Sequence, residues 1–195
     1  MDQVINRRII LGIFLLVFGI GGYTLTKTMH QAPPSVGEAV QAEVPAAEIE
    51  KTPHVEIINE EGQNIGTVVL KQDAKGVALH IQVSKLSPGK HGIHIHEAAF
   101  ADTDFETAGA HLNPYHKHHG LENPKGPHLG DMPNLDVKSD GTAEATFFLS
   151  NATLEKGKEN SLSGRSIIIH EKEDDQKSDP AGNSGERIAG GVIPE

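Results

Sequence analysis

The segment from His91 to Asp131 constrains the fold more than any other part of the chain, because eight of the twelve histidines lie within it. Most of it belongs to residues 98–133, which show no helical or strand periodicity and few large apolar side chains. A loop of that length is uncommon in a compact domain unless it is functional or something orders it. Imidazole is a common metal ligand, and ligation energy can substitute for apolar burial. The segment therefore predicts a loop ordered by bound metal.

The chain around this segment has a β pattern. Short runs rich in β-branched residues precede it (HVEIIN, IGTVVLK, VALHIQV) and follow it (NLDV, TAEATFFLS, SIIIHE), and a closing strand is expected near Ile188–Ile193. Polar and glycine-containing breaks such as EGQN and KQDAKG indicate hairpin turns. With 21 Gly, 11 Pro, 4% aromatic residues and no Trp, the composition also favours an all-β domain over a helical bundle.

Two histidines lie side by side on one predicted strand. In HGIHIHE, strand alternation directs His94 and His96 to one face and Ile93 and Ile95 to the other. Two imidazoles on a rigid strand form half of a metal site. The alternative for this pattern alone is a strand with two solvated histidines.

The long loop contains a second candidate set, consisting of three imidazoles and one carboxylate: His111, His119, His128 and Asp131. Such a set suits tetrahedral zinc, and its members lie too far apart in sequence to share a helix face by accident. The other histidines outside the HxH pair are predicted to be surface residues or to have no partner: His30, His54, His80, His116 and His118. His170 ends a β run, and its position alone assigns it no role.

The N-terminus predicts a membrane anchor. Residues 1–8 carry Arg7 and Arg8, and Ile9 to Leu25 is uncharged, at the lower length limit for a spanning helix. Basic residues stay on the cytoplasmic side, which places residues 1–8 in the cytoplasm, residues 9–26 in the membrane and the remainder outside the cytoplasm. Residues 27–51, rich in Ala, Pro, Glu and Gln, predict a flexible linker to a folded domain at 52–195. If residues 9–26 are instead a cleaved signal segment, the domain is secreted.

Charge and cysteine content exclude several functions. The net charge of −10 argues against binding nucleic acid through its phosphates. The chain has no cysteine, which excludes disulfides, thiolate metal sites and a cysteine nucleophile.

From Pro53 to Ile193 the chain resembles the copper/zinc superoxide dismutases. The motifs HGIHIHE, AGAHLNP, HHG, HLGD, RSIIIHEKEDD and GNSGERIAGGVI match in order and spacing together. The resemblance implies a Greek-key β-sandwich or barrel of about eight strands with long metal-binding and electrostatic loops. It also implies dismutation of superoxide by copper, with zinc as the second metal. The sequence leaves homodimer formation open.

The resemblance assigns roles to individual residues. The copper ligands are His94, His96, His111 and His170, and His111 also bridges to zinc, whose other ligands are His119, His128 and Asp131. Asp174 is the carboxylate that hydrogen-bonds to one ligand of each metal. Arg187 receives the anion, and His111 also carries a proton, so these two are the expected catalytic residues.

The chain departs from the family in one respect that bears on the loop. Family members fasten a loop to the barrel with a disulfide, but Gly190 occupies the expected downstream position and Ala98–Phe105 contains no partner cysteine. The loop is therefore expected to depend more on zinc, and Arg187 to be held less firmly. Lys172, Lys177 and Arg187 are the cations nearby in sequence, and the sequence does not show which of them faces the copper.

Two other functions share the same ligands. A non-catalytic extracytoplasmic copper/zinc-binding domain for storage or delivery would need the ligands but neither Arg187 nor Asp174. A structural or adhesive β-domain would use zinc alone.

Overall fold

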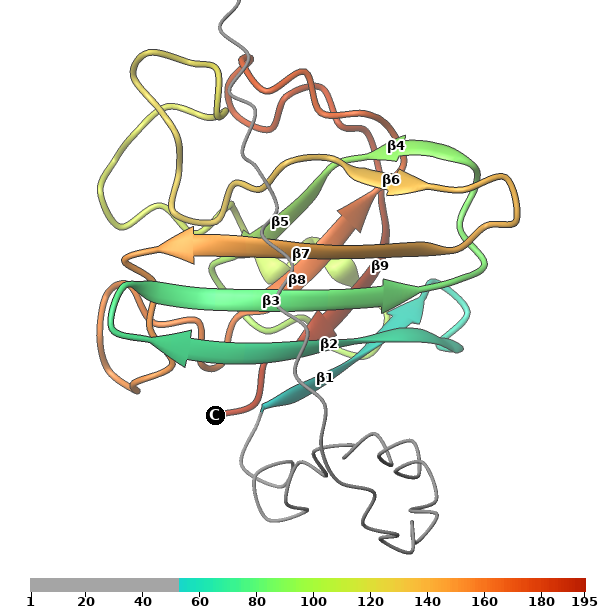
Figure 1. The fold of residues 1–195 in the computed structure, drawn as a ribbon, viewed down its shortest axis with the longest axis horizontal. Helices are drawn as coiled ribbons and strands as arrows, with labels where there is room; N and C mark the ends of the chain where they lie inside the picture. The colour runs from blue at the N-terminus through green and yellow to red at the C-terminus, as the bar shows by residue number, and fades with distance from the viewer. Residues whose placement is uncertain (1–52) are drawn as a thin grey trace, which may run out of the picture. The chain divides into compact units, whose positions relative to one another are not determined.

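The structure, a computed structural model, describes residues 53–195 (Figure 1). The described chain forms nine strands and one short 3₁₀ helix: β1 His54–Asn59, β2 Asn64–Asp73, β3 Gly76–Val83, β4 Gly89–His91, β5 Ile93–His96, η1 Phe105–Ala108, β6 Leu135–Val137, β7 Ala143–Ser150, β8 Ser166–His170 and β9 Arg187–Val192. The expected all-β class is confirmed. The expected strand number of about eight is one too low because Gly92 separates β4 from β5 within the HGIHIHE motif.

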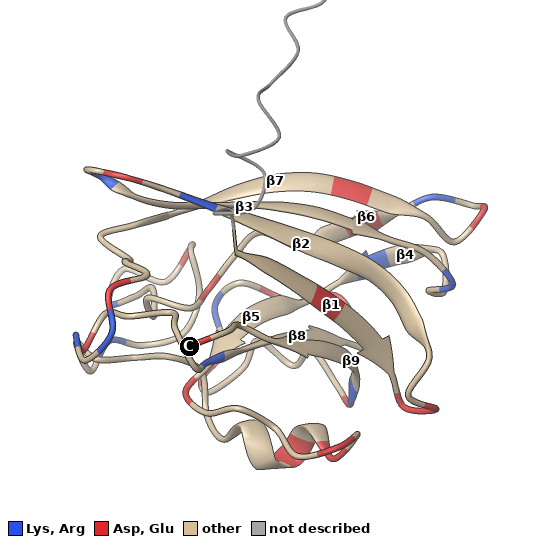
Figure 2. Cartoon of the chain, turned by 90° about the horizontal axis from the view of Figure 1, so that it is seen from below, with Lys and Arg blue, Asp and Glu red and all other residues tan. Residues whose placement is uncertain are grey.

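Seven strands form one antiparallel sheet in the order β5-β8-β9-β1-β2-β3-β7, and β4 and β6 form a separate two-stranded sheet. The hairpin-connected strands β1, β2 and β3 have the late strand β9 beside β1, which is the strand order of a Greek key. The large sheet curls strongly (Figure 2), but its edge strands β5 and β7 do not pair with each other. The domain is therefore a half-barrel, which fits the expected Greek-key β-sandwich or barrel.

Strand alternation places the core as the sequence predicts. Val77, Leu79, Ile81 and Val83 on β3 are all buried on one face, whereas His80 points to the other face and is partly exposed. The core continues through the isoleucines of β5 and β8. The opposite face of β5 and β8 carries histidines and is covered by the long loop, so these strands are buried on both faces.

Buried apolar side chains help to order the long loop between β5 and β6. Phe105, Leu112, Leu129 and Met132 of this loop are buried, whereas Tyr115 and Leu121 are exposed. Apolar packing against the sheet therefore contributes to the order of the loop, in addition to the bound metal that the sequence predicts.

The predicted cytoplasmic segment 1–8, membrane segment 9–26 and linker 27–51 lie outside the described residues. Across residues 53–195, no helix has the length and apolar character needed to cross a membrane.

Candidate metal centre

Three parts of the chain bring the predicted ligands together. His94 and His96 lie on β5, His170 ends the neighbouring strand β8, and the long loop contributes the others. Isolated bridges join His96 to His111 and His94 to Asp131, which ties the loop to the free edge of β5. All seven predicted ligands are buried. Strand pairing and these two bridges therefore build the site from residues 76 positions apart in sequence.

The first group of side chains consists of His94, His96, His111 and His170, whose candidate ligand atoms all lie within 4.8 Å of one another. Each ring has one buried nitrogen without a hydrogen-bond partner: Nδ1 of His94 and Nε2 of the other three. Burying an unpaired polar atom is costly, and native structures rarely leave one unexplained. Four such nitrogens facing one another fit a metal ion that takes imidazole ligands, as Cu(II) does.

The other nitrogen of each strand histidine is held by a hydrogen bond. His94 Nε2 lies 2.8 Å from Asp174 Oδ2, His96 Nδ1 donates to the carbonyl of Gly109 at 2.9 Å, and His170 Nδ1 donates to the carbonyl of Gly185 at 3.2 Å. Such contacts fix the tautomer and leave the opposite nitrogen with its lone pair free for a metal. The partners of these rings therefore orient the unpaired nitrogens.

The second group converges on Asp131. The Nδ1 atoms of His111, His119 and His128 lie 3.1, 3.1 and 3.3 Å from Asp131 Oδ1. The candidate ligand atoms of His94, His111, His119 and Asp131 also lie within 4.8 Å of one another. His128 is the better fourth member, because its Nδ1 faces the same carboxylate oxygen whereas His94 turns Nε2 to Asp174. Three imidazoles and one carboxylate suit zinc.

His111 belongs to both groups. Its Nδ1 faces Asp131, whereas its unpartnered Nε2 faces the first group. Its ring lies 4.0 Å, centroid to centroid, from that of His94 and 5.2 Å from that of His119. One imidazole can therefore contribute a ligand to two neighbouring metals.

Asp174 contacts one histidine of each group. Its Oδ2 accepts from His94 Nε2 at 2.8 Å, and its Oδ1 lies 3.0 Å from His119 Nε2. Asn134 holds the Asp174 backbone on both sides, accepting from its N–H and donating to its carbonyl at 2.8 Å each. Gly182 has φ +63°, and a Cβ there would lie 1.7 Å from Asp174 Oδ1. The carboxylate of Asp174 therefore fits only because residue 182 has no side chain.

Burial favours the uncharged form of the first-group rings. It lowers the pKa of His94 to about 3 and that of His170 to about 4, so both are neutral near pH 7 and their lone pairs are available. Burial opposes charge at Asp131 as well, but hydrogen bonds from His111, His119 and His128 hold the pKa of that carboxyl well below its ordinary range. The rings of His94 and His170 and the carboxylate of Asp131 are thus in the protonation states that metals require. At His119 burial again opposes charge, but Asp131 and Asp174 raise the pKa to about 9, so this ring must release a proton before it can bind a metal.

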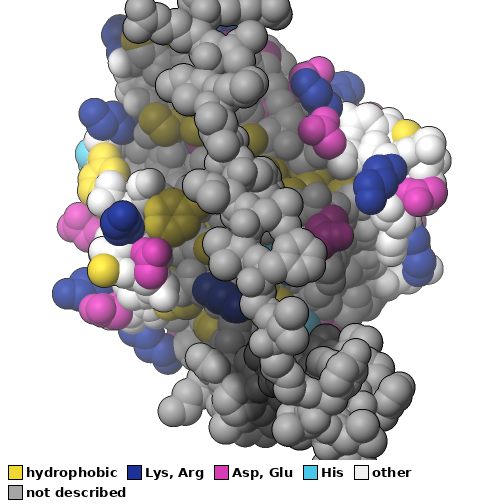
Figure 3. All heavy atoms as spheres, viewed as in Figure 1, with side chains coloured by type: hydrophobic (Ala, Val, Ile, Leu, Met, Phe, Trp, Pro, Cys, Tyr) yellow, Lys and Arg dark blue, Asp and Glu magenta, His cyan; other side chains and the backbone are white. Residues whose placement is uncertain are grey.

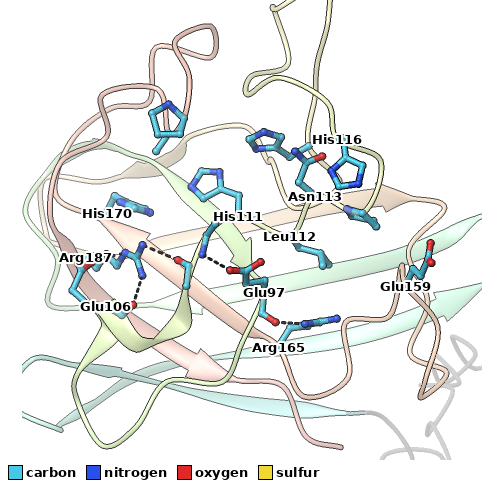
Figure 4. Close-up of a pocket in the computed structure, with 16 residues that line it drawn as sticks. Glu97, Glu106, His111, Leu112, Asn113, His116, Glu159, Arg165, His170 and Arg187 are labelled. Carbon is cyan, nitrogen blue, oxygen red and sulfur yellow. Dashed lines mark hydrogen bonds and ion pairs between the residues drawn. The ribbon is translucent and has the colours of Figure 1, made fainter.

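Arg187 lies beside the first group in a cavity of about 930 Å³, which His111, His128 and His170 also line (Figure 4). Its guanidinium donates to the carbonyl oxygens of Phe105 and Gly109 at 2.8 Å each. The loop before β6 therefore holds this cation at the cavity wall.

Of the three cations that are close in sequence, Lys172 and Lys177 lie away from the cavity. Lys172 pairs with Glu171 at 3.4 Å and Lys177 with Glu122 at 2.7 Å, and neither lines the cavity. The cationic side chain that does line it beside Arg187 is Arg165, which sequence reasoning missed. On the part of the surface visible in Figure 3, basic side chains are scattered among acidic ones, unlike the continuous basic stripe of nucleic-acid-binding proteins.

The remaining histidines of the described chain behave as predicted, with one exception, and His30 lies outside the described residues. His54, His116 and His118 are exposed, and His80 contacts Thr146 on the outer face of the sheet. His91 was overlooked although it begins the HGIHIHE motif. It is buried, with Nδ1 2.7 Å from the carbonyl of His170 and Nε2 2.9 Å from that of Ser87. It therefore supports the strand end that carries His170.

Fold and site together define an all-β domain with two adjoining groups of candidate metal ligands that share one imidazole. The family model for copper/zinc superoxide dismutase (SODC) matches residues 64–193, and the chain belongs to this family, whose metals are copper and zinc. It is 45% identical to superoxide dismutase [Cu-Zn] 1 of Aquifex aeolicus over 145 residues, covering 72% of this chain and 86% of that protein. It is 35% identical to the superoxide dismutase-like protein YojM of Bacillus subtilis over 197 residues, 96% of each chain. A crystal structure of a SOD-like protein from Bacillus subtilis superposes with a TM-score of 0.68 at 39% identity, covering 72% of this chain and 97% of that one.

Proposed function

We propose that this protein is a superoxide dismutase, which converts two superoxide anions and two protons to oxygen and hydrogen peroxide. The observation that carries the proposal is the position of Arg187 at the wall of the cavity that His111 and His170 line. Storing a metal requires the nitrogen ligands alone. A tethered guanidinium beside them adds a site for a small anion.

In this proposal, copper is held by His94, His96, His111 and His170, and zinc by His111 together with His119, His128 and Asp131. Copper, when bound, supplies the one-electron redox chemistry, because zinc has no accessible second oxidation state. Asp174 and the carbonyls of Gly109 and Gly185 hold the first-group rings in their orientation.

The chain's own residues bind the anion and deliver a proton. Arg187 keeps its guanidinium at the cavity wall through two carbonyl contacts and would bind superoxide by charge and hydrogen bonding. His111 is held at Nδ1 by Asp131, so its Nε2 is the atom that can carry a proton toward the bound anion. These two side chains are the proposed catalytic residues.

The test is superoxide turnover, followed by pulse radiolysis, of full-length protein loaded with copper and zinc. His170→Ala should abolish turnover and copper binding while zinc is retained. His80→Ala, which alters a partly exposed histidine outside both groups, is the matched control and should change nothing. Full turnover in His170→Ala would contradict the copper assignment, and no turnover in fully loaded wild type would refute the function.

The alternative is a non-catalytic extracytoplasmic copper/zinc-binding domain for storage or delivery. One comparison favours it: the relative that matches 96% of the chain is named superoxide dismutase-like. A storage protein would bind both metals, release copper to a competing chelator within its functional time and fail to turn over superoxide. The same loaded protein therefore distinguishes the two functions.

We further propose that residues 9–26 anchor the domain on the outer side of the membrane. The uncharged run and the preceding Arg7 and Arg8 support this. Full-length protein should sediment with membranes and be released only by detergent, whereas a chain lacking residues 1–26 should remain in the supernatant. A mature protein that begins beyond residue 26 would show cleavage instead.

A further inference from the structure

No disulfide fastens the loop that holds Arg187 to the sheet, because the chain contains no cysteine. It carries η1 and presents the carbonyls of Phe105 and Gly109 to the guanidinium. The Gly109 carbonyl also accepts the hydrogen bond that orients His96. Whatever holds this loop therefore sets the position of both Arg187 and His96.

A separate hydrophobic cluster lies beneath the loop. Phe105, Ala108 and Ile168 are at most 3% exposed, and Phe100 and Ile58 pack against them. The rings of Phe100 and Phe105 meet edge to face, with centroids 4.9 Å apart and planes at 84°. Phe105 and Phe100 belong to the loop, whereas Ile168 belongs to β8, so the cluster joins the loop to the sheet.

Gly190 on β9 completes the cluster from the sheet side. A Cβ at Gly190 would lie 2.8 Å from Ile168 Cδ1 and 3.1 Å from Phe100 Cε1, closer than carbon atoms normally pack. The Phe100 ring therefore occupies the space that a side chain at position 190 would need. Polar contacts reinforce the attachment, since Phe100 N donates to Ser166 Oγ, which donates in turn to the Ala98 carbonyl.

We propose that Phe100 and Phe105 form an aromatic anchor that positions Arg187 and His96, so that the anion site is built by apolar packing on Gly190 and Ile168. These phenylalanines are positioning residues, since they act through the Phe105 and Gly109 carbonyls. This proposal rests on the proposed function in one respect, which is that Arg187 binds the anion. It adds apolar packing to zinc, on which the sequence led us to expect the loop to depend more.

The first experiment uses metal-free full-length protein and therefore needs neither metal nor activity. Hydrogen–deuterium exchange is followed at the amides of Ala98 and Gly109, which donate to carbonyls within the loop at 3.0 and 3.2 Å. Phe100→Ala should speed their exchange about tenfold, because removing a packed ring destabilises the element that rests on it. Phe148→Ala is the matched control, since this phenylalanine on β7 is 46% exposed and should leave the loop unchanged.

The second experiment titrates azide into copper- and zinc-loaded protein and follows the copper absorption band. Phe100→Ala should weaken azide binding about fivefold or more with metal content unchanged, since a misplacement of about 1 Å is costly at a preorganised site. Phe100→Leu should restore most of the affinity. Gly190→Ala displaces the ring from the other side and should reproduce the loss.

Wild-type exchange at Ala98 and Gly109 together with wild-type azide affinity in Phe100→Ala would overturn the proposal. So would a loss of azide affinity that is fully explained by lost copper. Failure of the wild-type protein to dismutate superoxide would refute the proposed function, while the exchange and azide comparisons would still decide whether the anchor positions Arg187.

Discussion

Asp174 offers the sharpest test of how the two metal groups are coupled. Asp174→Asn keeps the shape of the side chain but removes its charge and one acceptor. Asp174 Oδ1 accepts from the Gln176 N–H at 2.6 Å, so the asparagine oxygen should stay there and its NH₂ group should replace Oδ2 opposite His94 Nε2. Two donors would then meet, and His94 could relieve the clash only by moving its proton to Nδ1.

That change places a hydrogen on the nitrogen that faces the first group. A hydrogen bond to a charged partner contributes about 1.5–3 kcal/mol, and losing the residue behind a ligand typically weakens metal binding about 10- to 100-fold. We expect copper affinity to fall by this factor. Zinc affinity should fall less, because His119 keeps the contact of its Nε2 with Oδ1 at 3.0 Å.

The assay is competition for each metal against a chromogenic chelator, with the protein at fixed pH. Asp175→Asn is the control, since this neighbouring carboxylate is exposed and accepts hydrogen bonds only within its own turn and from Asn183. Copper affinity within twofold of wild type in Asp174→Asn would show that Asp174 does not control the ring of His94.

Three further predictions concern the same region. Gly182→Ala should lower both metal affinities about tenfold, because its Cβ would displace the Asp174 carboxylate and crowd the His119 ring; normal occupancy by metal analysis would contradict the crowding. Arg187→Ala should lower kcat/KM about 10- to 100-fold and flatten its salt dependence, with Arg187→Lys intermediate; an unchanged salt slope in pulse radiolysis would mean that Arg187 does not guide the anion. For metal-free protein, the pKa values of about 3 for His94 and 4 for His170 lie below the value of about 6.5 expected when unfolded. The unfolded chain therefore takes up protons first, and the free energy of unfolding should fall as pH drops from about 6.5 toward 4; a midpoint of thermal unfolding that stays constant across this window would refute the assignment of these rings as buried and neutral.

The sequence by itself determined most of the strands and the candidate ligands. Alternation in VALHIQV assigned the buried face of β3 correctly, because side chains on a strand have a period of two. The order of the histidine motifs also identified the seven candidate ligands that the fold brings together, since residue type and spacing are properties of the chain itself. His91 could have been recognised from its place at the start of the same motif.

Only the tertiary structure decided which nitrogen of each ring is free and what holds the other. For His96 and His170 those partners are the backbone carbonyls of Gly109 and Gly185, and every residue has a carbonyl, so no residue type reveals them. The same holds for the cations: Lys172 and Lys177 are near Arg187 in sequence, but their glutamate partners and the shape of the cavity exclude them from its lining. The packing of Phe100 against Gly190 joins residues 90 positions apart, and such a contact exists only once the sheet has curled and the loop has closed over it.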